Sequence, residues 1–124
     1  MTPSRVIAAA FALAALIIAP LAVRAHAFLD HSDPAVGSTV PSPPSVLHLW
    51  FTQQVEPAFS SVTVTDQSGA SVNDGSAAID PNNQSELDVK LKNLTSGTYT
   101  VKWHVLSVDT HTTEGDFNFQ VKRS

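Results

Sequence analysis

Five histidines carry most of the chemistry available to this sequence, and they occur in different contexts. They are His26 and His31 near residue 30, His48 and His104 inside alternating apolar segments, and His111 in "VDTHTTEGDF". Asp109-Thr110-His111 sets a carboxylate and an imidazole two positions apart, and in extended backbone such residues project to the same side. Both side chains would then be aimed at one point. Two ligands make no firm metal site, and a turn-capping Asp109 beside a solvated His111 is the plainer interpretation.

His26 adds donors if it becomes the first residue of a processed chain. Residues 1–25 are typical of a cleaved export signal, with Arg5 in a short basic start, an apolar run to about residue 23, and Ala25 at a small-residue cut site. A cut after Ala25 exposes His26, whereas a cut after Ala27 removes it, and the second triplet is the better formal match. The rival interpretation is a permanent anchor, because the run approaches the roughly 18 to 20 residues that span a bilayer. Pro20 and the cut site favour export.

A free N-terminal histidine chelates one ion through its amine and its imidazole. Together with Asp109 and His111 it would give three nitrogen donors and one oxygen donor, a set that suits tetragonal Cu(II). Zinc is a plausible competitor because it also accepts histidine and carboxylate ligands. Cu(I) prefers sulfur, which a processed chain would lack: the sequence has no cysteine, and its only methionine is Met1.

Composition limits the other function classes. Residues 26–124 are enough for one compact domain. Two of the seven basic residues but none of the eleven acidic ones lie in the leader, so this domain is acidic. That balance argues against a nucleic-acid partner, which needs a basic face. The absence of cysteine excludes thiolate metal sites and thiol chemistry.

The elements that must position these residues are short strands. Apolar residues alternate with polar ones in segments bounded by Gly, Pro, Asn, Asp and Ser, and no stretch after the leader has helical periodicity. Strands are expected at 46–52, 61–66, 85–94, 97–109 and 115–122. The predicted core faces are Leu47, Leu49 and Phe51; Val62 and Val64; Leu87, Val89 and Leu91; Tyr99, Val101, Trp103 and Val105; and Phe117, Phe119 and Val121. The pattern predicts an all-β, immunoglobulin-like sandwich of about seven strands, with His48 and His104 on outer faces.

Three blocks in order resemble the CopC-type periplasmic copper-binding proteins of bacterial copper resistance: "HAFLDHSDPAVGSTV", "LHLWFTQQVEPAFSSVTVTDQSGASV" and "LTSGTYTVKWHVLSVDTHTTEGDFNFQV". The resemblance covers essentially all of residues 26–124. It implies a small Greek-key β-sandwich, export to the periplasm (secretion in a host without an outer membrane), and a mature chain that begins at His26. It also implies one Cu(II) per chain, bound by the amine and side chain of His26 with Asp109 and His111 as the remaining ligands.

The sequence also departs from the family pattern. Gln53 stands where many members have an acid, and Thr112 where many have a proline. The methionine-rich segment that holds Cu(I) in some members is missing, so a Cu(II) site alone is expected, and His48 is not carried over as a Cu(I) ligand.

The expected function is therefore a copper carrier or buffer for copper resistance and homeostasis, without enzymatic activity. Its partners would be the copper ion and an inner-membrane copper transporter, with no nucleic acid and no membrane span after processing. One alternative is a copper oxidase or monooxygenase with an N-terminal histidine site. Another is a metal-free exported interaction domain, in which an exposed Trp50 would mark a partner surface. His31 is expected to face water or to lie just outside the ligands.

Overall fold

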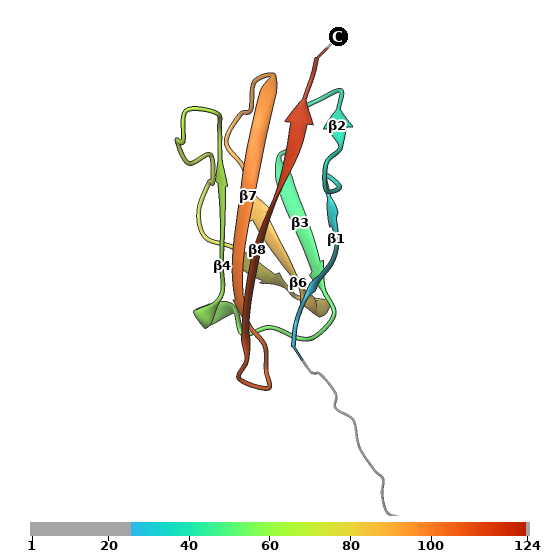
Figure 1. Ribbon diagram of the computed structural model, residues 1–124, viewed down its shortest axis with the longest axis vertical. Helices are drawn as coiled ribbons and strands as arrows, with labels where there is room; N and C mark the ends of the chain where they lie inside the picture. Colours follow the sequence, from blue (N-terminus) through green and yellow to red (C-terminus); the bar gives the residue numbers. More distant parts are fainter. Residues whose placement is uncertain (1–25, 124) are drawn as a thin grey trace, which may run out of the picture.

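The structure is a computed structural model that describes residues 26–123. In that range the chain forms eight strands and one short 3-10 helix (Figure 1). The strands are β1 (Leu29–Asp33), β2 (Thr39–Val40), β3 (Val46–Phe51), β4 (Ser61–Thr65), β5 (Ala78–Asp80), β6 (Asn83–Lys90), β7 (Gly97–Leu106) and β8 (Thr112–Val121), and the helix is η3 (Pro57–Phe59). The expected export signal, residues 1–25, lies outside the described residues. No described helix is long and apolar enough to cross a membrane.

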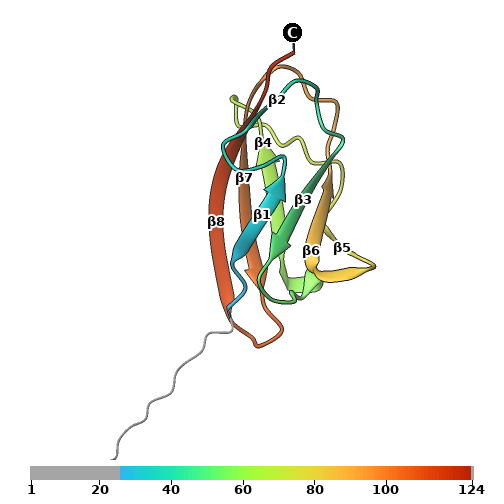
Figure 2. The ribbon, with the colours of Figure 1, turned by 90° about the vertical axis from the view of Figure 1, so that its right-hand side faces the viewer.

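The strands form two four-stranded sheets that pack face to face (Figures 1 and 2). One sheet has the order β1-β3-β6-β5, and the other has the order β2-β8-β7-β4. Consecutive strands such as β3 and β4, or β6 and β7, belong to different sheets, as in a Greek-key sandwich. All pairings are antiparallel except that of β2 with β8. The predicted all-β sandwich is confirmed.

The core lies between the sheets and consists of the residues that alternation placed there. Leu47, Leu49, Leu87, Val89, Val101 and Phe119 have no exposed surface, and every residue of the predicted core faces is buried. Apolar side chains that alternate along a strand share one face, so burying that face removes them from water together. His48 and His104 lie on outer faces, as predicted.

The strand ends differ from the prediction where the backbone turns. The segment expected at 97–109 ends as a strand at Leu106, and β8 begins at Thr112 rather than at residue 115. The strand expected at 85–94 is β6, which ends at Lys90. The short strands β1, β2 and β5 carry too few alternating apolar residues to be delimited from sequence.

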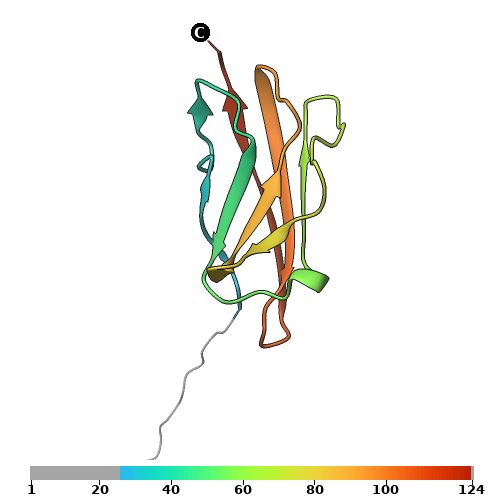
Figure 3. The same ribbon diagram turned by 180° about the vertical axis from the view of Figure 1, so that it is seen from behind.

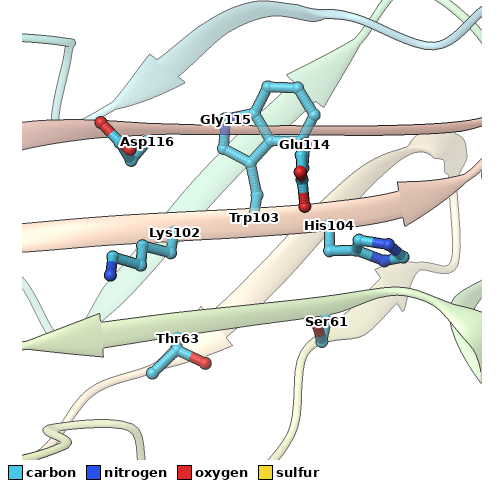
Figure 4. A pocket seen from close by; sticks show the side chains of 8 residues that line it. All are labelled: Ser61, Thr63, Lys102, Trp103, His104, Glu114, Gly115 and Asp116. Carbon is cyan, nitrogen blue, oxygen red and sulfur yellow. The ribbon is translucent and has the colours of Figure 1, made fainter.

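Close packing joins β7 to β8 near their shared turn. Gly115 lies opposite Trp103, and a Cβ atom at Gly115 would come within 2.7 Å of the indole ring. The ring crosses β8 at this glycine (Figure 4) and packs edge-on against Phe51 of the other sheet, with ring centroids 5.3 Å apart. This contact fixes the end of the hairpin that carries Asp109 and His111.

Candidate metal centre

The start of the described chain and the β7–β8 turn meet at one end of the sandwich, opposite the C-terminus (Figures 1 and 3). Ala27 is fully buried, and its carbonyl oxygen accepts a hydrogen bond from the Thr113 hydroxyl. The Thr52 hydroxyl accepts from the Phe28 amide at 3.0 Å and donates to the His26 carbonyl oxygen at 3.3 Å. The backbone around His26 is therefore attached to both sheets.

Asp109 and His111 lie in a turn. The prediction that they lie in extended backbone is therefore wrong. The Thr110 amide donates to the Ser107 carbonyl at 2.9 Å, and the Ser107 amide donates to the His111 carbonyl at 2.9 Å. Thr110 has a φ of 73°, a left-handed conformation that β-branched residues rarely adopt. Residues 107–111 thus form the turn of a hairpin, where the alternating pattern alone predicts that the strand continues.

The turn nevertheless brings the two predicted ligands together. Nδ1 of His111 lies 3.3 Å from Oδ2 of Asp109. The Ser107 hydroxyl donates a hydrogen bond to Oδ1 of the same carboxylate. This bond, with a smaller contribution from His111, holds the pKa of Asp109 below its usual value. Asp109 is therefore ionised at neutral pH and ready to act as an oxygen ligand.

His26 completes the group from the other side. Its ring stacks on that of His111, with centroids 4.4 Å apart and planes 29° apart. The donor atoms of His26, Asp109 and His111 do not all lie within 4.8 Å of one another. Because Ala25 precedes His26 in this chain, the His26 nitrogen is a peptide nitrogen, and the amine donor requires processing.

The other histidines that the sequence singled out lie elsewhere. His31 stacks on Trp50 at 4.4 Å, and its Nδ1 lies 2.6 Å from Oδ2 of Asp30. His104 is exposed on β7, where it faces Glu114 across the pair (Figure 4). Trp50 is half-buried between His31 and His48.

His48 belongs to a cluster that the sequence did not reveal. Its Nδ1 lies 2.7 Å from Oδ1 of Asp88 and 3.1 Å from Oε2 of Glu86. Within residues 26–123 this is the one group of three His, Asp or Glu residues whose donor atoms all lie within 4.8 Å of one another. The alternation of β6 places Glu86 and Asp88 on its outer face, but only the pairing of β3 with β6 brings them to His48.

Comparison with known proteins agrees with the fold. The CopC domain matches residues 29–122. Protein YobA of Escherichia coli K12 is 40% identical over 81% of this chain and 82% of its own length. Copper resistance protein C of Xanthomonas campestris pv. juglandis is 32% identical over 95% of this chain and 97% of its own. The copper transport protein CutJ of Bacillus subtilis is 29% identical over 88% of this chain, which spans only 20% of CutJ.

Solved structures show the same sandwich. The crystal structure of CopC from Methylosinus trichosporium OB3b has a TM-score of 0.74 and 35% identity, covering 79% of this chain and 95% of that one. PcoC, a methionine-rich copper resistance protein from Escherichia coli, has a TM-score of 0.70 and 29% identity, covering 79% of this chain and all of PcoC. Sequence and structure thus agree over nearly all of the described domain, and the chain belongs to the CopC family.

Proposed function

We propose that the processed chain carries or buffers one Cu(II) in the periplasm, for copper resistance and homeostasis. In a host without an outer membrane the same protein would be secreted. The ion is held by the amine and imidazole of His26, the carboxylate of Asp109 and the imidazole of His111. Three nitrogen donors and one oxygen donor fill the equatorial plane that Cu(II) prefers. The relatives named above as copper resistance and copper transport proteins support the choice of metal.

The observation that carries the proposal is the stacking of His26 on His111. The two rings come from segments far apart in the sequence, yet their centroids lie 4.4 Å apart, with Asp109 beside His111. The hydrogen bonds of Thr52 and Thr113 hold the backbone of His26 and Ala27 in place. Cleavage after Ala25 would free the amine at this spot, and the stacked rings would have to rotate to turn their nitrogens toward one ion.

A donor set that is filled by the protein favours a carrier over an enzyme. Oxidase or oxygenase chemistry at copper needs an open coordination position for oxygen or substrate, whereas sequestration does not. Exposed apolar side chains next to the ligands in the sequence suit transfer to another protein, for which an inner-membrane copper transporter is the natural class. Phe28 and Val108, which are 54% and 46% exposed, are near neighbours of His26 and Asp109 in the sequence.

The test is an EPR titration with Cu(II) of protein recovered after natural export, with the N-terminus determined by mass spectrometry. We expect His26 as the first residue and an axial spectrum with nitrogen hyperfine structure for the first equivalent of copper. His111→Ala should weaken that first equivalent by at least about 100-fold, because a nitrogen ligand is lost. His104→Ala removes an exposed strand histidine and is the matched control.

Two results would overturn the proposed binding site. One is a mature chain that begins after Ala27, which would lack the amine and imidazole of His26. The other is a first equivalent of copper that binds equally well in the His111→Ala and His104→Ala proteins. Turnover of a reductant or a polysaccharide by the copper form would replace the carrier with the oxidase alternative.

A further inference from the structure

A mixed nitrogen and oxygen cluster occupies the outer face of the β1-β3-β6-β5 sheet, the sheet nearer the viewer in Figure 3. His48 on β3 lies directly opposite Asp88 on β6, and Trp50 lies directly opposite Glu86. Side chains that face each other across antiparallel strands share one side of the sheet. The imidazole and both carboxylates therefore converge without any contribution from a loop.

We propose that His48, Glu86 and Asp88 form a second metal site, which binds a divalent cation of the Cu(II) or Zn(II) class. It is separate from the group formed by His26, Asp109 and His111, and it does not depend on cleavage of the leader. Imidazole and carboxylate are the ligand types that these borderline ions accept.

The distances within the cluster are close to those of a metal site. Two ligand atoms that each lie about 2.0–2.2 Å from an ion are roughly 3 to 3.5 Å apart. Nδ1 of His48 lies 3.1 Å from Glu86 and 2.7 Å from Asp88. An ion can enter if these atoms separate by a few tenths of an ångström, and Nε2 of His48 can then keep the ring proton.

The electrostatics of the cluster favour a cation. Glu86 is only 8% exposed, and Asp88 is half-buried beside it. The two carboxylates share one face of the sheet, and His48 lies within ion-pair distance of both. No Lys or Arg forms an ion pair with either carboxylate in the part of the chain that the structure describes. A divalent ion would neutralise both.

The surroundings give an ion access and add negative charge. His48 and Asp88 line a surface hollow of about 510 Å³, which Asp74, Ser76 and Lys90 also line. Asp33 on β1 is exposed and lies directly opposite His48. Lys90 is the one cation in this lining, and the acidic groups outnumber it. A hydrated ion can therefore reach the cluster from solvent.

Trp50 offers a local reporter. Its ring centroid lies 5.6 Å from that of His48, and bound Cu(II) quenches indole fluorescence at such distances. The test uses processed protein carrying His111→Ala, so that copper at the other centre is weakened. Cu(II) is titrated near neutral pH against a weak competing chelator, and both tryptophan emission and the copper bound per chain are followed. On the His111→Ala background, a second substitution, His48→Gln or Asp88→Asn, removes a ligand. His104→Gln on the same background is the matched control.

We expect the His111→Ala protein to bind copper with quenching of tryptophan emission, and His104→Gln to leave that binding unchanged. His48→Gln and Asp88→Asn should each weaken it at least tenfold. Thermal unfolding of the metal-free variants checks that they are folded. If His48→Gln does not fold, Asp88→Asn still tests the site, because asparagine has nearly the size of aspartate. Equal affinity and equal quenching in all four proteins would overturn the second site. That result would leave the proposal for His26 intact, because His111→Ala tests it separately.

Discussion

The two candidate centres are built in different ways. At one end of the sandwich, His26 comes from the start of the domain, and Asp109 and His111 come from a hairpin turn. On the outer sheet face, His48, Glu86 and Asp88 all sit on the paired strands β3 and β6. As proposed, the first group would need proteolysis and the turn at Thr110 before its donors are complete, whereas the second would be ready when the sheet forms. A centre on a chain end can be switched by processing, and a centre on strands cannot.

The sharpest way to separate the two centres is to block the N-terminus. A processed protein with one extra residue before His26 converts the amine donor into a peptide nitrogen. We expect it to bind its first Cu(II) at least about 100-fold more weakly, as measured by competition with a chelator. Copper binding at His48, Glu86 and Asp88, followed by tryptophan emission, should not change. An unaltered first affinity would show that the amine is not a ligand.

A smaller effect is expected from the residue that orients Asp109. Ser107→Ala removes the hydroxyl that donates to the carboxylate, and we expect the first copper to bind about tenfold more weakly, since supporting hydrogen bonds to ligands contribute on this scale. Ser38→Ala is the control, because that hydroxyl donates only to Ala35 at 2.7 Å. If both variants bind copper alike, Ser107 does not position the ligand.

Loss of the Ser107 hydroxyl should also change how the stability of the protein depends on acidic pH. It keeps the pKa of Asp109 below its unfolded value, so this stabilisation is complete above the unfolded pKa and is lost as the pH falls through the folded pKa. The melting temperature of the metal-free Ser107→Ala protein should therefore fall less than that of the wild type when the pH is lowered from neutral to acidic.

The strain in the turn predicts a stabilising change. Thr110 holds a φ of 73°, and left-handed backbone at such a residue costs on the order of 1 kcal/mol. Asparagine tolerates this conformation, so Thr110→Asn should raise the free energy of unfolding by about 1 kcal/mol or somewhat less in denaturant titrations. Thr112→Asn, in the first position of β8, is the control and should give no gain. A loss of stability in Thr110→Asn would contradict the assignment of strain.

The smallest expected effect lies at the strand cluster without metal. Burial lowers the pKa of His48, but its hydrogen bonds with Asp88 and Glu86 outweigh burial, so the pKa lies above the usual 6.5. The stabilisation from protonated His48 is complete below pH 6.5 and is lost as the pH rises through the folded pKa. With a chelator present, the melting temperature of the wild type should exceed that of His48→Gln more at acidic than at alkaline pH. His104→Gln should show no such trend, and a constant difference for His48→Gln would refute the shift.

Much of the fold follows from local pattern. Alternation identified the inner faces of β3, β4, β6, β7 and β8, because one buried face of a strand imposes a period of two. The short strands β1, β2 and β5 were not delimited, since a few residues carry too little periodicity. The strand expected to end at residue 109 ends at Leu106, because residues 107–111 form a hydrogen-bonded turn that contains neither glycine nor proline to signal it.

The sequence by itself determined the all-β class, the acidic charge and the candidate ligands His26, Asp109 and His111. Two of those ligands are close in sequence, and the third stands beside a processing signal, so local inspection finds them. Only the tertiary structure stacked His26 on His111 and brought Glu86 and Asp88 to His48. The register between β3 and β6 is set by burying Leu47, Leu49, Leu87 and Val89 together, and the polar cluster on the opposite face follows from that packing.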